Sequence, residues 1–394
     1  MPRSPPLLPL LTWLLCLPLL ASAAPFRPSA DAQVLATVPA RASDPNAREL
    51  VTLRQAWRAQ PRDPDAAVAL ARRYFEAVAA EGDPRYIGYA QAALQPWWTL
   101  PQPPVAVRVL RAQLLQFDHR FDEALADLDA ALAEQPGNGS AWSWRTAILM
   151  VTADYPRARQ SCERMAPLAT PLIAAACLAQ VDAITGHAGQ ATAHLRLALA
   201  KNPTADAAEK LWALTRLAET EERRGDNIAA EAAFRAALAL GEPEVYLQAA
   251  YADFLLDRSR PAEVLTLLAD GARADLLLLR LALAAKAQGD PRAARWRDEM
   301  AARFEAAQRR GDVSHRKEES RFVLALQGDA RRALALAQQN FAVQREPADA
   351  RILLEAALAA KQPAAAQPVL DWMAASGIES LALHGLAERL KGLR

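Results

Sequence analysis

The side chains that most often bind metals are present but scattered along the chain. The five histidines are His119, His187, His194, His315 and His384. None belongs to a His-Glu-x-x-His motif, and the sequence contains no Cys-x-x-Cys motif, so the two commonest zinc-binding patterns are missing. His187 and His194 are close in sequence, but His187 falls in a Gly-His-Ala-Gly turn and does not share a helix with His194. We therefore expect no metal site and no cofactor.

Two pairs of adjacent acidic residues have the composition of a general acid and its base. These are Glu221–Glu222 and Glu318–Glu319, and arginines flank both. Charged, solvated helix surface is therefore the better interpretation of both pairs. The segment Gly137–Ser140 looks like a phosphate loop, but it lacks the lysine that such a loop needs. It follows Pro136 and is typical of a turn in which Ser140 caps the next helix. We expect no catalytic residues.

Composition favours a helical protein without a nucleic-acid partner. Ala, Leu, Arg, Glu and Gln dominate, whereas Gly (15 residues) and the aromatic residues (6%) are scarce. The residues that fill sheet interiors are too few for a large β domain. Lys and Arg together number 46 against 45 Asp and Glu, so the basic excess typical of nucleic-acid-binding proteins is absent.

The first 23 residues predict a signal peptide. A short positively charged start precedes the apolar run Leu7–Leu20, and Ala21–Ala23 places small residues where signal peptidase needs them. The apolar run is shorter than the ~20 residues of a membrane-spanning helix, and no later segment approaches that length without charges. We expect cleavage near Ala23, no membrane span in the mature chain, and export. The Ala- and Arg-rich composition suggests a bacterium with GC-rich DNA, and hence the periplasm.

A pattern with a period near 34 residues runs through most of the chain. In each copy a small residue is followed by apolar residues three, four, seven or eight positions later, as Ala124 is by Leu128, Ala131 and Leu132. The small residue recurs at intervals of 30 to 39 residues, at Ala90, Ala124, Ala158, Ala191, Ala230, Val264, Ala294, Ala333 and Ala366. A small side chain lets two helices cross closely, and larger neighbours fill the groove beside it. Such a period is typical of stacked helix–turn–helix units.

From roughly Asp65 to Arg394 the chain resembles tetratricopeptide-repeat (TPR) proteins. Gly-Asp turns at residues 225, 289 and 328 precede three of the small residues, and Pro136 and Pro203 close repeat units. Trp142 and Phe234 match the bulky and aromatic positions of the family pattern. The resemblance implies an all-α fold, a right-handed superhelical solenoid of stacked TPR-like hairpins. Glu81–Ala90 is also similar to a segment of exported bacterial TPR proteins of uncharacterised role.

The expected organisation has four parts. Residues 1–23 are the signal peptide, and residues 24–64 form an extended segment followed by a capping helix at Arg48–Ala59. Residues 65–379 hold about nine repeat units, and residues 380–394 form a C-terminal capping helix that covers the last unit. The two 39-residue spacings imply longer helices near Ala205–Lys210 and Ala306–Val313. Because the repeats leave no room for a catalytic domain, we expect a protein that is not an enzyme.

Cys162 and Cys177 are the two cysteines outside the predicted signal peptide. In repeat coordinates they lie on neighbouring packed helices, and an even pair in an oxidising compartment favours a disulfide. A bridge closing this 15-residue loop would stabilise the fold by up to ~3 kcal/mol. The alternative is a pair of small, buried, apolar thiols, and either role is structural.

The first helices of TPR units line a concave groove that accepts a peptide or a partner helix. The positions that usually face this groove are occupied here by Gln113, Gln116, Trp212, Glu219, Glu222, Tyr246, Asp253, Phe322, Arg351 and Glu355. Their aromatic and carboxylate side chains favour a polar peptide ligand that carries some basic residues. Ordinary solvated surface is the alternative for any one of them.

These observations predict a non-catalytic scaffold for protein–protein interaction, exported to the periplasm, with a protein or peptide partner of unknown identity. The alternative is an accessory protein that binds envelope polysaccharide or peptidoglycan. That alternative would need rows of exposed aromatic residues in the groove, whereas the groove positions hold only isolated ones.

Overall fold

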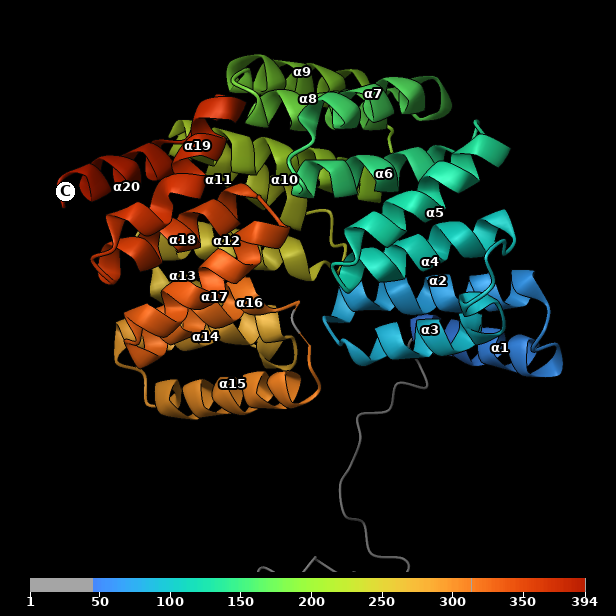
Figure 1. The fold of residues 1–394 in the computed structure, drawn as a ribbon, viewed down its shortest axis with the longest axis horizontal. Helices are drawn as coiled ribbons and strands as arrows, with labels where there is room; N and C mark the ends of the chain where they lie inside the picture. Colours follow the sequence, from blue (N-terminus) through green and yellow to red (C-terminus); the bar gives the residue numbers. More distant parts are fainter. Residues whose placement is uncertain (1–44, 313, 394) are drawn as a thin grey trace, which may run out of the picture. The chain divides into compact units, whose positions relative to one another are not determined.

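Helices packed as successive hairpins make up the protein (Figure 1). The computed structural model describes residues 45–312 and 314–393, and within these ranges it contains helices and no strand. The expected all-α solenoid of helix–turn–helix units is confirmed. The chain divides into two units, Met1–Arg48 and Glu49–Arg394, and the second contains almost all of the described residues. The predicted signal peptide and the extended segment to residue 44 lie outside the described residues.

In the described part of the chain, nine hairpins lie between α1 (Pro45–Ala59) and α20 (Leu381–Lys391). They are α2 (Pro64–Glu81) with α3 (Arg85–Trp98), α4 (Val105–Phe117) with α5 (Phe121–Glu134), α6 (Gly139–Val151) with α7 (Tyr155–Met165), α8 (Pro171–Ile184) with α9 (Ala188–Lys201), α10 (Ala207–Arg224) with α11 (Asn227–Leu238), α12 (Val245–Asp257) with α13 (Pro261–Leu267), α14 (Asp275–Gln288) with α15 (Arg292–Arg309), α16 (Arg316–Phe322) with α17 (Ala330–Val343), and α18 (Pro347–Ala359) with α19 (Gln367–Ser376).

Short irregular turns join some of these helices. Three are 3₁₀ turns: η2 (Ala166–Leu168), η3 (Gly271–Arg273) and η5 (Pro363–Ala366). The fourth, η4 (Val323–Gln327), is a π-helical turn that continues α16. The longer helices expected from the two 39-residue spacings are confirmed, because α10 and α15 each have 18 residues.

The small residue of the repeat lies at the tightest helix contacts. Eight of the nine have no exposed surface: Ala90, Ala124, Ala158, Ala191, Ala230, Val264, Ala333 and Ala366. Each lies in the second helix of its hairpin or, for Ala366, in the 3₁₀ turn that leads into it. The side chains at these points are no larger than that of valine. The first and second helices therefore approach closely enough for the larger apolar residues to interlock.

The prediction for Ala294 is wrong, because this residue is exposed. The buried stripe of α15 runs through Trp296, Met300 and Phe304. Residue 294 lies two positions before Trp296 and therefore about 200° around the helix axis, on the outer side. In α15 three large side chains, preceded by the half-buried Ala293, pack against the first helix of the hairpin. In the other units a small residue lies at this crossing.

Units far apart in the sequence meet within Glu49–Arg394. The backbone amide of Arg345 donates to the carbonyl oxygen of Val151 at 2.8 Å. The indole nitrogen of Trp372 in α19 donates to the hydroxyl of Tyr155 in α7 at 2.8 Å. Contacts also join α2 to α12 and α10 to α20. The first helices of these units therefore face one another across an interior space.

Gly82 marks one of these long-range contacts and provides a test of it. Gly82 ends α2 with φ 66°, and a Cβ atom there would lie 2.5 Å from Cβ of Ala274. Gly241 has a similar φ of 75° with open space around it. We expect Gly241→Ala to lower the free energy of unfolding by about 1–2 kcal/mol through backbone strain alone. Gly82→Ala should lower it by a further ~1–3 kcal/mol because Ala274 must move. Thermal melts followed by circular dichroism measure both, and equal losses would contradict the contact.

A disulfide joins Cys162 of α7 to Cys177 of α8, with 5.6 Å between their Cα atoms. Both residues are buried in the core. We expect the Cys162→Ala/Cys177→Ala double variant to unfold with up to ~3 kcal/mol less free energy than the wild type. Maleimide labelling of the denatured mature chain should modify these two cysteines only after reduction. Labelling without reductant would show that the bridge does not form.

Candidate functional site

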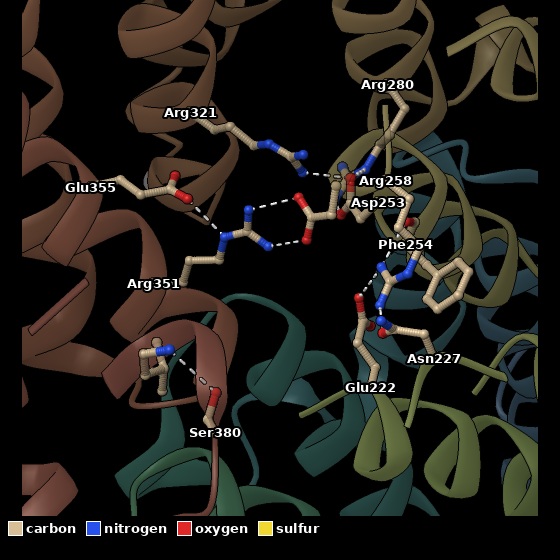
Figure 2. Close-up of polar contacts among 12 residues, drawn as sticks. Glu222, Asn227, Asp253, Phe254, Arg258, Arg280, Arg321, Arg351, Glu355 and Ser380 are labelled. Carbon is tan, nitrogen blue, oxygen red and sulfur yellow. Dashed lines mark hydrogen bonds and ion pairs between the residues drawn. The ribbon is translucent and has the colours of Figure 1, made fainter. Parts of the chain in front are cut away.

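The facing first helices enclose a cavity of ≈820 Å³. Its wall is built from α10, α12, α14, α16 and α18, together with the ends of α2, α4, α6 and α8 and the start of α20. Apolar and charged side chains both reach it. Figure 2 shows part of its polar lining, in which arginine and carboxylate side chains from different hairpins point toward one another.

Seven of the ten residues predicted to face the groove line this cavity: Gln116, Glu219, Glu222, Tyr246, Asp253, Arg351 and Glu355. Gln113 and Trp212 do not line it. Gln113 is buried, and Trp212 is half-buried against the core.

Phe322 is the third exception, and its prediction as a groove residue is wrong. It is 2% exposed and packs on Phe304, with 5.3 Å between the ring centroids. The π-helical turn η4 inserts an extra residue between Phe322 and the small residue Ala333. Counting back from Ala333 with an α-helical repeat therefore misplaces the groove position by one residue. Arg321 takes that position and lines the cavity.

Asp253 is held by two guanidinium groups from other hairpins. Arg280 of α14 donates to both of its oxygens, at 3.1 and 2.6 Å, and Arg321 of α16 donates at 2.7 Å. Burial alone would raise the pKa of Asp253, but the charges of Arg280 and Arg321 outweigh it and lower the pKa to about 2. Sequence analysis missed both arginines, because they come from units other than that of Asp253.

Arg351 makes the longest-range ion pair of the lining. Its guanidinium binds both oxygens of Asp257, which is 94 residues away on α12, and its Nε donates to Glu355 at 2.7 Å. Figure 2 shows Arg351 beside Glu355, with the hydrogen bond from its Nε drawn as a dashed line. The pair joins two hairpins that are distant in the sequence at the wall of the cavity.

Glu222 is a carboxylate of the lining whose surroundings disfavour ionisation. It accepts a hydrogen bond from Arg258 at 3.2 Å (Figure 2). Burial and the nearby negative charge of Asp257 nevertheless raise the pKa of Glu222 to about 7. Two carboxylates of the same cavity thus have pKa values shifted in opposite directions, Asp253 down and Glu222 up.

Glu219 of α10 and Tyr246 at the start of α12 form a polar contact between the two helices. Arg216 pairs with Glu219 at 3.0 Å, and the hydroxyl of Tyr246 donates to the same carboxylate. The guanidinium of Arg216 also lies 5.1 Å from the centroid of the Tyr246 ring, within range of a cation–π interaction. Tyr246 is 44% exposed, and it lines the cavity.

Lys317 and Glu346 complete the charged wall, and Asp349 lies buried behind them in α18. Asp349 is fully buried and accepts from Asn340 at 2.8 Å and from the backbone amide of Glu346 at 2.9 Å. Glu346 in turn caps α18. Lys317 Nζ lies 3.9 Å from Asp349. Burial raises the pKa values of Glu346 and Asp349 despite the charge of Lys317.

The cavity is thus equipped to bind polar and apolar groups in fixed places. Among residues 45–312 and 314–393, no group of three or more His, Cys, Asp and Glu is arranged to hold a metal ion. Over the same residues, no helix has the length and the hydropathy that crossing a bilayer requires. Glu219, Glu222 and Asp253 are each paired with a guanidinium group, so a basic ligand would have to displace an arginine to reach any of them.

Comparison with known proteins identifies the fold alone. No family model matches the sequence, and no curated protein matches it. The crystal structure of the APC/C hetero-tetramer Cut9–Hcn1 aligns with TM-score 0.51 and 13% identity, over 88% of this chain and 66% of that chain.

Two further solved structures align less well. A TPR protein from Parabacteroides merdae aligns with TM-score 0.43 and 15% identity, over 65% of this chain and 91% of that one. A Rap protein complexed with Competence and Sporulation Factor aligns with TM-score 0.46 and 13% identity, over 89% and 100%.

The opposite pKa shifts of Glu222 and Asp253 predict opposite effects of neutralising them. Folded Glu222 keeps its proton up to about pH 7, whereas the unfolded chain loses it near pH 4.5, so this residue lowers stability progressively as pH rises between these values. We expect Glu222→Gln to remove this fall and to be more stable than the wild type at pH 8 by about 2–3 kcal/mol. Urea unfolding at pH 5, 6, 7 and 8 measures the difference, and parallel pH profiles for the two proteins would contradict it.

Asp253→Asn is the matched variant with the opposite sign. The lowered pKa of Asp253 contributes stability that is present above pH 3.8 and is lost as pH falls through about 2. The substitution leaves Arg280 and Arg321 without a counter-charge, so we expect a loss of ~3–5 kcal/mol at pH 5 to 8. The same urea series measures it, and a variant as stable as the wild type would show that the two arginines do not need this carboxylate.

Proposed function

The chain is a TPR-like solenoid, and on that premise we propose that it is a non-catalytic interaction scaffold that binds a peptide or a segment of a partner protein in its cavity. One observation carries the proposal: the first helices of at least five hairpins present polar side chains to a single enclosed space of ≈820 Å³. This volume lies within the ~300–1,000 Å³ of sites that enclose a ligand. It suits a short segment better than a folded domain.

The lining supports binding as the role of this space. Its charged groups are fixed by partners, as Arg351 is by Asp257 and Glu355 and Asp253 is by Arg280 and Arg321. Preorganised groups lose little conformational entropy when a ligand arrives, which favours affinity. Tyr246 adds an aromatic surface that faces the cavity.

We further propose that the protein works in the periplasm. Two independent features support this. The first 23 residues have the composition of a signal peptide. The disulfide between Cys162 and Cys177 is a bond that persists in oxidising compartments and is rare in reducing ones.

A bulky side chain in the cavity tests the proposed role. Ala250 of α12 is half-buried and lines the cavity, so we expect Ala250→Trp to block it. Ala236→Trp, on the exposed face of α11, is the matched control. Crosslinking of the tagged protein in its host, followed by mass spectrometry, should recover a protein partner with the wild type and the Ala236→Trp variant. Its yield should fall by at least ~10-fold with the Ala250→Trp variant.

Two outcomes would overturn the proposal. One is a partner that the Ala250→Trp variant captures as well as the wild type does, which would place binding on another surface. The other is recovery of envelope glycan without any protein partner, which would favour the polysaccharide-binding alternative. Equal thermal stability of the two tryptophan variants is the folding control.

A further inference from the structure

The charges of the cavity lining are paired with one another almost completely. Asp275 pairs with Arg303, and Lys317 with Glu318. Glu244 accepts the backbone amide of Leu247 and caps α12. Within the described residues, every carboxylate that lines the cavity has a cationic partner or caps a helix. The lining therefore offers no free carboxylate to a basic ligand.

Arg223 of α10 is different. Within the described residues its guanidinium has no carboxylate partner, and the hydrogen bond that it makes is from Nη2 to the hydroxyl of Thr220 at 3.1 Å. Its Nε is buried and has no acceptor. The nearest acidic residues on the same helix, Glu219 and Glu222, are bonded to Arg216 and Arg258 instead.

The environment of Arg223 compensates its charge only in part. Burial is the main cause that lowers the pKa of Arg223; the negative charges of Glu219 and Glu222 act against this effect, and the positive charge of Arg216 adds to it. An arginine nevertheless stays protonated in a protein. Arg223 is therefore a partly desolvated cation, which is an unfavourable state that an incoming anion would relieve.

Arg216 adds a second donor on the same face of α10. It lies seven residues before Arg223, which is about two helical turns, and both residues line the cavity. Its Nε is also buried and has no acceptor. A guanidinium group binds a carboxylate through paired N–H donors, so two guanidinium groups that line one wall are suited to an anionic oxygen group.

Apolar side chains lie on helices that pack against α10. Ile184 at the end of α8 and Leu383 at the start of α20 line the same cavity, and both helices contact α10. The cavity that Arg223 lines thus also has apolar surface, on two helices that neighbour α10.

We propose that the ligand of the cavity carries a carboxylate on an apolar body, with the carboxylate bound by Arg223 and aided by Arg216, and the apolar body against Ile184 and Leu383. The proposal rests on the proposed function and names the chemistry of its ligand. The carboxylate has two sources with this chemistry, the C-terminus of a peptide that ends in apolar residues or a free medium-chain carboxylic acid.

The experiment uses two acids and their uncharged counterparts. Acetyl-Ala-Leu-Leu with a free carboxyl group is compared with its C-terminal amide, and decanoate is compared with decanol, by isothermal titration into the full mature chain. We expect one acid or both to bind, and its counterpart to bind at least ~10-fold more weakly, because a charge-assisted hydrogen bond contributes that much. Which acid binds identifies the source of the carboxylate.

Three variants locate the site. Arg223→Gln should weaken binding of the acid by about 10- to 100-fold. Arg223→Lys keeps the positive charge but loses the paired N–H donors of the guanidinium group, so it should weaken binding less. Arg295→Gln removes one positive charge from the exposed face of α15 and should leave binding unchanged. We expect Arg223→Gln to melt at or above the wild-type temperature, because the variant loses a partly desolvated cation that has no ion-pair partner among the described residues, so weaker binding by a folded variant is not a stability effect.

Any of three results would overturn the inference. Neither acid binds; the acid binds the Arg223→Gln variant as tightly as the wild type; or the uncharged counterpart binds the wild type as tightly as the acid does. These results differ from failure of the proposed function. If Ala250→Trp still abolishes capture of the partner, the cavity is the binding site and only the assignment of its anion subsite is wrong.

Discussion

The close crossing of two helices at a small side chain is the contact on which the rest of this structure depends. It recurs in eight of nine hairpins with the small residue fully buried. Because Ala or Val holds the helices of each hairpin close together, the apolar residues three to eight positions later can interlock. Repeated along the chain, this packing places every first helix on one side and every second helix on the other. An interior lined by first helices follows directly from it.

Contacts between distant units then turn a groove into a cavity. Trp372 bonded to Tyr155, and the amide of Arg345 bonded to Val151, join the last hairpins to the third. Arg351 and Asp257 form an ion pair across the space between them. Half-buried ion pairs of this kind add little net stability, since desolvation offsets their attraction. Their larger effect is geometric: each pair stabilises one arrangement of two hairpins and so sets the width of the cavity.

The charge pattern of the lining is set by ion pairs between different hairpins. Carboxylates and guanidinium groups neutralise one another, so most of the wall is polar but electrically balanced. Against that background the guanidinium of Arg223, which has a buried Nε and no carboxylate partner among the described residues, has a disproportionate effect. Its charge is partly desolvated and already positioned, and these are the conditions in which an ion pair with a ligand contributes most.

Sequence by itself determined the features that depend on neighbours in the chain: the helical class, the hairpin period, the turns, the lengths of α10 and α15, and seven residues that face the interior. Local periodicity dictates these, because 3.6 residues per turn decide which side chains share a face. Only the tertiary structure decided the rest. The π-helical turn after Phe322 and the large side chains of α15 changed which residues of those helices face the interior or the core. No local signal in the sequence marks either change. Which arginine meets which carboxylate, as Arg351 meets Asp257 from 94 residues away, depends on how far the hairpins coil. Small rotations at each crossing add up over many units to set that coiling, and no single segment of the sequence encodes the sum.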